Sequence, residues 1–231
     1  MSTGLTWLRG REKVFKKFHE TVANMMVEAV GKRDRVAVLD VGCGAGHPFV
    51  EFKKKLPPHV QIVYEGVEKD EVVCEHARAL GIDVYCMPVE AFLSFDNGKR
   101  YDIIVLSSVL EDLLLDGREK TVRILRGLAS RLAPCGTLIA TMSNSRNWCV
   151  RYTMKRGWRR TPAITRAEFV QLLTDAGLQV KELRGVCFTM PLSLKKGYRF
   201  VFLPQWLCRL INVFDRLHED KCIFMIARCS G

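Results

Sequence analysis

One stretch of the chain decides the fold: Val36-Ala37-Val38-Leu39-Asp40-Val41-Gly42-Cys43-Gly44-Ala45-Gly46-His47. The apolar residues at its start predict a buried strand, and the three alternating glycines predict a tight turn into a helix. Glycine adopts positive φ and carries no Cβ, so the main chain can approach a ligand closely at this turn. The helix that follows directs its unpaired backbone N–H groups toward the same place. The stretch therefore predicts a nucleotide-cofactor site.

The spacing of the glycines, together with a second acid, selects the kind of cofactor. A dinucleotide fingerprint has its third glycine where this chain has His47, whereas the pattern here is Asp-x-Gly-x-Gly-x-Gly, which begins at Asp40. A second predicted strand, 61–65, runs into Glu68, about twenty residues past the glycines, where a carboxylate accepts hydrogen bonds from both ribose hydroxyls. Glu65 lies inside that strand and is the poorer candidate. These features resemble the class I S-adenosylmethionine-dependent methyltransferases.

This resemblance implies an α/β fold: a Rossmann-like sheet of seven strands, mostly parallel, with helices on both faces and an antiparallel last strand. The alternation of strand and helix patterns along the chain agrees with such a fold. Strands are expected near 36–40, 61–65, 83–86, 101–106, 137–142, 178–186 and 222–228. A leading helix over 11–31, with its apolar residues on one face, is expected to cap the cofactor site.

We expect residues 1–231 to form a single methyltransferase domain with two parts. Residues 1–145 would be the cofactor-binding half with its leading helix, and they hold twenty Lys and Arg against nineteen Asp and Glu. Residues 146–216 would cover the substrate, and they hold fourteen against four, which accounts for most of the net charge of +11. This uneven charge predicts an anionic partner: a phosphate-bearing small molecule, a nucleic acid or a membrane surface. A solvated basic face without a specific partner is the alternative.

The resemblance also assigns residues to the cofactor, S-adenosylmethionine. The predicted binding residues are Asp40, Gly42, Cys43, Gly44, Gly46, Glu68, Val89, Glu90, Ser107 and Ser108. Val89 and Glu90 follow the third strand and are expected to contact the adenine, although Pro88 stands where relatives often have an acid. A glutamate at the start of a helix is an equally ordinary explanation of Glu90. Ser107 and Ser108 follow the fourth strand, at the edge where ligands of open α/β sheets bind.

A hydroxyl acceptor would need a group that takes up its proton. Quinone-type O-methyltransferases, which this chain resembles, have Leu-Glu-His after the fourth strand, whereas this chain has Leu110-Glu111-Asp112. Asp112 and Glu111 are therefore the candidate catalytic residues. His47 is a weaker candidate, because a residue in the first turn after the glycines more often packs or caps than acts as a base. The missing imidazole also leaves a non-catalytic cofactor-binding module as an alternative.

Two stretches of the basic half are expected to meet the substrate. Residues 144–160 carry six basic residues, three aromatic residues and no acid. This composition suits the binding of a phosphate together with a ring or nucleobase, and a solvated helix without a ligand is the alternative. Residues 195–217 lie between the last two strands and include an amphipathic helix at 204–217. That helix either packs on its own domain or contacts a membrane surface or lipid substrate.

These observations favour O-methylation of a small or lipid-linked anionic metabolite. RNA methylation is the alternative enzyme activity, but the Asn/Asp-Pro-Pro-aromatic tetrapeptide that grips base amines is absent. The nine cysteines are scattered without a Cys-x-x-Cys pair, so no disulfide framework and no metal site are expected. No apolar run reaches the length of a membrane span. The protein is therefore expected in the cytoplasm, with a peripheral membrane contact through 195–217 as an option.

Overall fold

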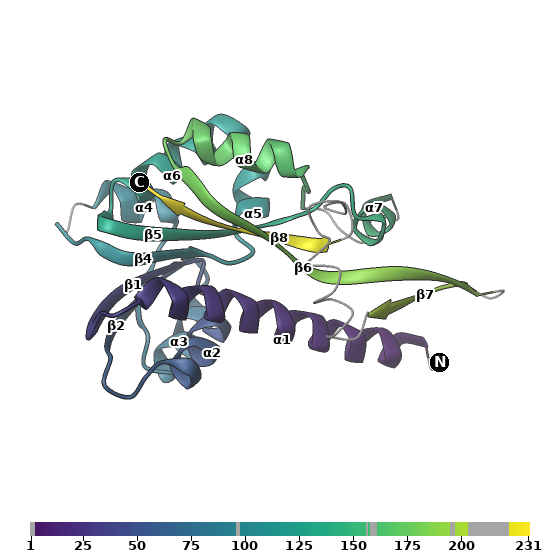
Figure 1. Ribbon diagram of the computed structural model, residues 1–231, viewed down its shortest axis with the longest axis horizontal. Helices are drawn as coiled ribbons and strands as arrows, with labels where there is room; N and C mark the ends of the chain where they lie inside the picture. The colour runs from purple at the N-terminus through teal and green to yellow at the C-terminus, as the bar shows by residue number, and fades with distance from the viewer. Residues whose placement is uncertain (1–2, 96–97, 156, 158–160, 195–196, 203–221) are drawn as a thin grey trace.

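A mixed β-sheet lies at the centre of the protein in this computed structural model, which describes residues 3–95, 98–155, 157, 161–194, 197–202 and 222–231 (Figure 1). Its strands are β1 (Arg35–Val41), β2 (Gln61–Glu68), β3 (Asp83–Cys86), β4 (Tyr101–Leu106), β5 (Leu132–Ser143), β6 (Gln179–Leu194), β7 (Gly197–Phe202) and β8 (Cys222–Ser230). Within these residues their spatial order is β3-β2-β1-β4-β5-β8-β6-β7. Strands β3 to β5 run parallel, and β8 lies antiparallel between β5 and β6.

This topology confirms the predicted Rossmann-like sheet with its antiparallel closing strand. All seven predicted strands are present, with ends that differ by a few residues. The structure adds an eighth strand, because β6 continues to Leu194 and pairs with β7 inside the segment that was predicted as an insertion. The amphipathic helix predicted at 204–217 lies outside the described residues.

Two layers of helices cover the sheet (Figure 1). One face carries α1 (Thr3–Val30), α2 (His47–Lys55) and α3 (Glu71–Ala79), and the other carries α4 (Val89–Ser94), α5 (Leu110–Leu115), α6 (Arg118–Ala129) and α8 (Arg166–Asp175). Each layer closes a separate apolar core, built around Phe18 and Phe52 on the first face and around Phe92 and Phe169 on the second. The inner strands are therefore buried on both faces, as their apolar sequences require.

Short-range sequence features set the ends of several helices. The predicted capping box begins α8: the Thr165 hydroxyl accepts a hydrogen bond from the Glu168 backbone N–H, and the Glu168 carboxylate accepts one from the Thr165 N–H at 2.7 Å. Helix α1 begins at Thr3, earlier than the predicted residue 11. Its apolar side packs against the sheet as far as β8, where the centroids of the Phe18 and Phe224 rings lie 4.6 Å apart.

The carboxyl ends of β1, β2 and β4 lie together at one edge of the sheet. Val41 is in register with Val67 of β2 and with Leu106 of β4. The residues that come next on each strand are therefore neighbours in space. Helix α7 (Trp148–Lys155) follows β5 at the same edge, and the β6–β7 hairpin and the N-terminal half of α1 also extend beyond the sheet on this side (Figure 1).

Candidate active site

The glycine turn follows β1, and its three glycines serve two different purposes. Gly42, Gly44 and Gly46 have φ values of 65°, 53° and 78°. A Cβ on Gly42 would lie 2.4 Å from Cγ2 of Val109, and one on Gly46 would lie 2.8 Å from Cδ1 of Ile82. A Cβ on Gly44 would meet no atom within 4 Å. The outer glycines are therefore needed for packing as well as for φ, whereas Gly44 presents bare backbone to open space.

Cys43 holds the turn against the sheet. Its side chain is 3% exposed and packs on Gly66 of β2, where a Cβ would lie only 2.6 Å from the Cys43 sulfur. The backbone N–H groups of Gly42 and Cys43 both donate to the Val67 carbonyl, at 2.7 and 3.2 Å. Burial raises the pKa of the Cys43 thiol, so the thiol stays protonated. Cys43 can therefore face a ligand only through its backbone.

Glu68 lies beside this turn, and Glu65 does not. One carboxylate oxygen of Glu68 accepts a hydrogen bond from the Gly44 N–H at 3.2 Å, and the other accepts from the N–H groups of Lys69 and Asp70. Glu65 is 3% exposed and accepts a hydrogen bond from the Tyr101 hydroxyl at 2.7 Å, under the opposite helix layer. Glu68 is thus the acid that reaches the glycine backbone.

Asp40 and Ser107 place unpaired polar atoms at the ends of β1 and β4. Asp40 is fully buried, and Oδ2 accepts a hydrogen bond from the Tyr64 hydroxyl at 2.8 Å. Within the described residues, Asp40 Oδ1 and Ser107 Oγ have no hydrogen-bond partner. The pKa of Asp40 is raised to about 7: burial is the largest cause, the Tyr64 hydrogen bond opposes it, and the charge of Glu68 adds to it.

These groups fit S-adenosylmethionine. The ligand would bring a cationic ammonium and sulfonium, which suit a buried carboxylate with an unpaired oxygen, and a ribose, which suits Glu68 beside Gly44. Ser108 adopts a φ of 62°, and its N–H donates to Oγ1 of Thr141 at 2.8 Å, so that the turn after β4 is fixed next to the glycine turn. The predicted residues on β1, β2 and β4 are thereby brought together.

The predicted adenine contacts differ in how available their side chains are. Val89 begins α4 and is almost fully buried in the core with Phe92. Glu90 forms an ion pair with Lys120 at 2.6 Å, and this cation lowers the pKa of the Glu90 carboxyl. Lys120 also pairs with Asp116. The Glu90 carboxylate is therefore already engaged with α6.

The two candidate catalytic acids occupy very different places on α5. Glu111 is 4% exposed, and Oε1 accepts hydrogen bonds from the N–H of Ser143 at 3.0 Å and from its hydroxyl at 2.7 Å. It thereby ties α5 to the end of β5. Asp112 lies next to it in the first turn of α5 and is exposed.

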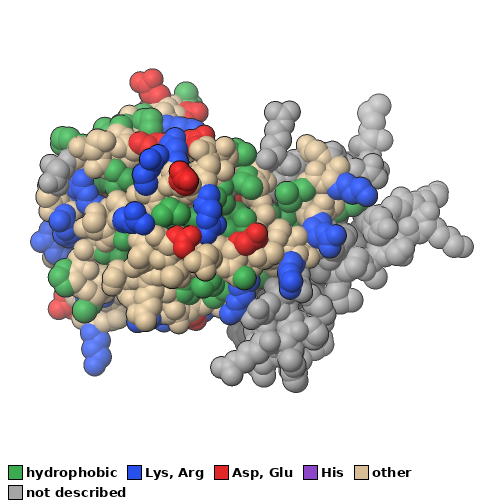
Figure 2. Space-filling view, turned by 90° about the horizontal axis from the view of Figure 1, so that it is seen from above, with side chains coloured by type: hydrophobic (Ala, Val, Ile, Leu, Met, Phe, Trp, Pro, Cys, Tyr) green, Lys and Arg blue, Asp and Glu red, His purple; other side chains and the backbone are tan. Residues whose placement is uncertain are grey.

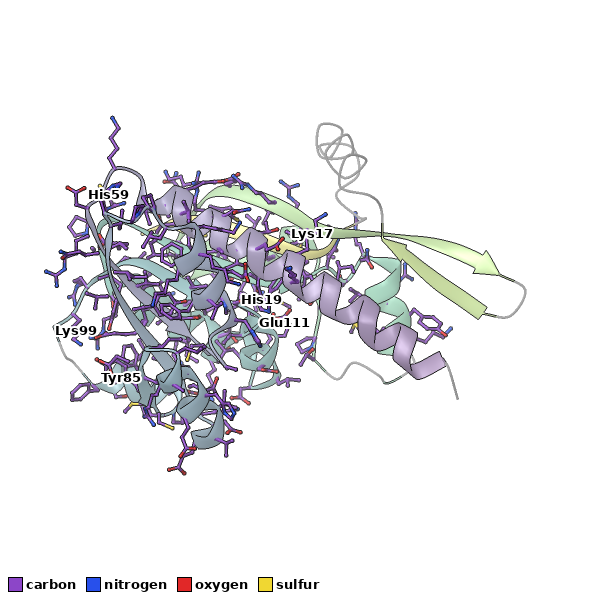
Figure 3. All side chains as sticks on the ribbon, turned by 90° about the horizontal axis from the view of Figure 1, so that it is seen from below. Lys17, His19, His59, Tyr85, Lys99 and Glu111 are labelled. Atoms are coloured by element: carbon purple, nitrogen blue, oxygen red, sulfur yellow. The ribbon has the colours of Figure 1, made fainter. Side chains whose placement is uncertain are left out.

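A pair of histidines lies close to the glycine turn, and sequence analysis missed one member. His47 is the first residue of α2 and is exposed, and His19 extends from α1 toward the body of the molecule (Figure 3). Their rings are stacked, with centroids 5.4 Å apart and planes at 29°. Burial, followed by the proximity of His47, lowers the pKa of His19 to about 4. No motif marks His19; only its place beside Phe18, on a helix expected to cap the site, could have indicated it.

The described part of the basic segment carries cations without acidic partners. Arg151 and Lys155 are exposed on α7, and within the described residues neither lies within 4 Å of an acid. Lys and Arg side chains gather at this end of the described surface, whereas over the helices of the same view they are mixed with Asp and Glu (Figure 2). In the part of the chain that the structure describes, no helix is long and apolar enough to span a bilayer.

Known methyltransferases are similar to this chain in sequence profile and in fold. A family profile described as a methyltransferase domain matches residues 9–183. Among curated proteins nothing matches. The chain is similar to a solved SAM-dependent methyltransferase from Archaeoglobus fulgidus, with 14% identity, coverage of 97% of this chain and 99% of that one, and a TM-score of 0.64.

Two further solved structures have the same fold. Magnesium protoporphyrin IX methyltransferase from Synechocystis PCC 6803, with bound SAH, has 15% identity, coverage of 99% and 94%, and a TM-score of 0.60. Mitomycin 7-O-methyltransferase has 18% identity, coverage of 91% of this chain and 53% of that one, and a TM-score of 0.58. The family profile covers most of the chain and agrees with the glycine turn, with Glu68 and with the strand order. The chain therefore belongs to the methyltransferase-domain family and is a class I S-adenosylmethionine-dependent methyltransferase.

Proposed function

We propose that the protein methylates a hydroxyl group of a small anionic acceptor. The observation that carries this proposal is the pair of unpaired, exposed cations on α7, Arg151 and Lys155, because α7 follows β5 at the edge where the cofactor residues meet. Some surface cations of the described chain, such as Arg118 and Arg184, have carboxylate partners at 2.8 Å, whereas others, such as Arg123 on α6, lie away from the cofactor edge without one. Cations without partners at a ligand-binding edge favour a negatively charged ligand.

The cofactor would be held by the residues around the glycine turn. Glu68 would accept hydrogen bonds from the ribose hydroxyls, and Asp40 would face the cationic methionine part. The backbone of Gly42 to Gly46 would line the cofactor. Ser107 and Ser108 would border the methionine part, and Val89 and Glu90 the adenine. When bound, S-adenosylmethionine supplies an activated methyl group, so the chain's main tasks are alignment and exclusion of water.

Two of the similar solved structures, magnesium protoporphyrin IX methyltransferase and mitomycin 7-O-methyltransferase, support a small-molecule acceptor by their names. The predicted alternative acceptor, RNA, has the basic and aromatic composition of 144–160 in its favour and lacks a base-gripping motif. A lipid-linked acceptor would bring residues 195–217 to a membrane surface from the cytoplasm. Membership in the methyltransferase family favours an enzyme over a non-catalytic module. Asp112 and Glu111 stay candidate proton acceptors.

The test is a measurement of S-adenosylhomocysteine formation with matched acceptors. We expect turnover with 4-hydroxybenzoate to exceed turnover with the uncharged 4-hydroxybenzamide, and the difference to shrink in an Arg151→Gln/Lys155→Gln variant. Further arms contain total RNA and vesicles of phosphatidylglycerol with an embedded hydroxylated quinone. Turnover only with the vesicles would select the lipid-linked version. Turnover only with RNA, or no preference for the charged acceptor, would contradict the proposal.

A further inference from the structure

The stacked histidines join α1 to α2, the helix that follows the glycine turn. His47 comes directly after Gly46, the last glycine of the turn, and His19 lies on α1, which packs along α2. The ring centroids are 5.4 Å apart at an interplanar angle of 29°, which is the geometry of an offset stack. Such a stack restricts the orientation of the His47 ring and leaves the edge that carries its nitrogens available.

His47 has the availability that a proton acceptor needs. Its neighbours Pro48 and Phe49 are buried, but His47 itself is exposed at the first position of α2, after the N-cap residue Gly46. In the described portion of the chain no residue forms a hydrogen bond with either ring nitrogen. Sequence analysis expects a residue at this position to pack or cap, and the ring of His47 does pack on that of His19, while its nitrogens stay without a described partner.

The acids on α5 are less well placed for the same task. Glu111 is buried and accepts two hydrogen bonds from Ser143, so moving a proton through it would disturb the end of β5. Asp112 is exposed, and no described side chain holds its carboxylate in one orientation. General-base catalysis depends first on geometry, and of these three described candidates His47 is the one whose side chain has an unengaged edge and a stacking partner that restricts its orientation.

We propose that His47 accepts the proton of the acceptor hydroxyl and that His19 positions the His47 ring. The inference rests on the proposed O-methylation. In the transfer, a bond forms between the acceptor oxygen and the methyl carbon, the bond from that carbon to sulfur breaks, and the hydroxyl proton passes to an imidazole nitrogen of His47. His47 is then regenerated by releasing the proton to solvent. His47 is the catalytic residue and His19 a positioning residue.

The electrostatics around the pair agree with these roles. His19 is held neutral at pH 7, its pKa being lowered to about 4, so it adds no second positive charge when His47 is protonated. Glu51, one turn further along α2, opposes this lowering of the His19 pKa, and it accepts a hydrogen bond from Lys54 at 2.9 Å. Lys16 on α1 and Lys55 on α2 are the other charges that act on Glu51.

The first experiment follows the imidazole resonances of isotope-labelled histidine by NMR, with S-adenosylhomocysteine as the added ligand. We expect the His47 resonances to shift on ligand addition and those of His59 to stay unchanged, because His59 lies in the exposed loop after α2, far from His19 (Figure 3). In His19→Ala the His47 resonances should lose the ring-current shift of the stack. An unchanged His47 signal on binding would overturn the inference without involving catalysis.

The second experiment measures kcat for 4-hydroxybenzoate together with S-adenosylhomocysteine affinity. We expect His47→Asn to lose about 100-fold or more in kcat, with ligand affinity within about threefold of wild type. His19→Phe, which keeps an aromatic face, should retain most of the activity, whereas His19→Ala should lose about tenfold and shift the acidic limb of the pH profile. His59→Asn is the matched control and should match wild type.

The outcomes separate this inference from the proposed function. Retention of kcat in His47→Asn, with loss in Asp112→Asn, would assign the proton to α5 and overturn the inference alone. Equal losses in His19→Phe and His19→Ala would reject the stacking role. A folded wild-type protein that binds S-adenosylhomocysteine but methylates no hydroxyl acceptor would instead refute the O-methylation on which the inference rests.

Discussion

The glycine turn and α7 differ in how their polar groups are engaged. At the turn, the backbone of Gly42 and Cys43 is tied to Val67, and Glu68 is held by three N–H groups. On α7, Arg151 and Lys155 are exposed, with no acid near them in the described residues. The first region is fixed by its own short-range geometry, whereas the cations of the second have no charged partner among the described residues. A site for a shared cofactor can therefore be recognised locally, and a site for a particular acceptor cannot.

The largest effect on stability is expected from Gly42→Ala, and Gly44→Ala is the variant to compare it with. Both need a positive φ, which costs about 1–2 kcal/mol for alanine, but only at Gly42 does the new Cβ meet Val109, at 2.4 Å. We expect Gly42→Ala to destabilise the protein by about 2–5 kcal/mol. Gly44→Ala should cost about 1–2 kcal/mol in stability and nearly abolish cofactor binding. Urea unfolding and calorimetry with S-adenosylhomocysteine measure the two; equal stability losses would refute the division of roles.

Glu68→Ala tests the acid at the turn. Loss of a carboxylate that accepts ribose hydrogen bonds should weaken S-adenosylmethionine and S-adenosylhomocysteine about 10- to 100-fold by calorimetry. Glu65→Gln is the matched control, since Glu65 is engaged by Tyr101 and Lys99 rather than by the glycine turn. It should lower stability while leaving affinity close to wild type. The reverse pattern would place the ribose at Glu65.

The pH dependence of cofactor binding tests Asp40. Its pKa is raised to about 7 by burial, so the carboxyl is largely protonated below that pH. A cationic ligand favours the ionised form, and binding below pH 7 must therefore release a proton. We expect S-adenosylmethionine affinity to fall as pH falls, by up to about tenfold per unit below 7, and proton release to appear in calorimetry in buffers of different ionisation enthalpy. Asp40→Asn should flatten this dependence; a dependence that persists in Asp40→Asn would exclude Asp40 as its source.

The smallest effect is expected from Arg151→Glu on α7. Because Arg151 is exposed and unpaired in the described residues, stability should stay within about 0.5 kcal/mol of wild type, and cofactor affinity should be unchanged. The kcat/KM for 4-hydroxybenzoate should fall about 2- to 10-fold, and less at high salt. Arg123→Glu, an equal charge change on α6, is the control. Similar losses in both variants would indicate a general effect of net charge.

Sequence analysis predicted most of the fold because the decisive features are local. Alternating apolar strands, the glycine turn and the Thr165–Glu168 capping box each specify their own conformation, and the preference for Glu68 over Glu65 came from strand position alone. Strand β7 was missed because 197–202 lies between the last two predicted strands, in a segment that was interpreted as an insertion with an amphipathic helix. The stack of His19 on His47 was missed because it depends on how α1 packs on α2, which no spacing along the chain encodes.

The position of β8 has a consequence for how the chain folds during synthesis. Strand β8 lies inside the sheet, between β5 and β6, and its Phe224 packs on Phe18 of α1. One edge each of β5 and β6 therefore finds its partner only when residues 222–230 have left the ribosome, and contacts of such long sequence separation form slowly. Until then, these two strands present unpaired edges, and Phe18 of α1 lacks its contact with Phe224. Nascent chains of this protein should depend on chaperones until β8 has been made.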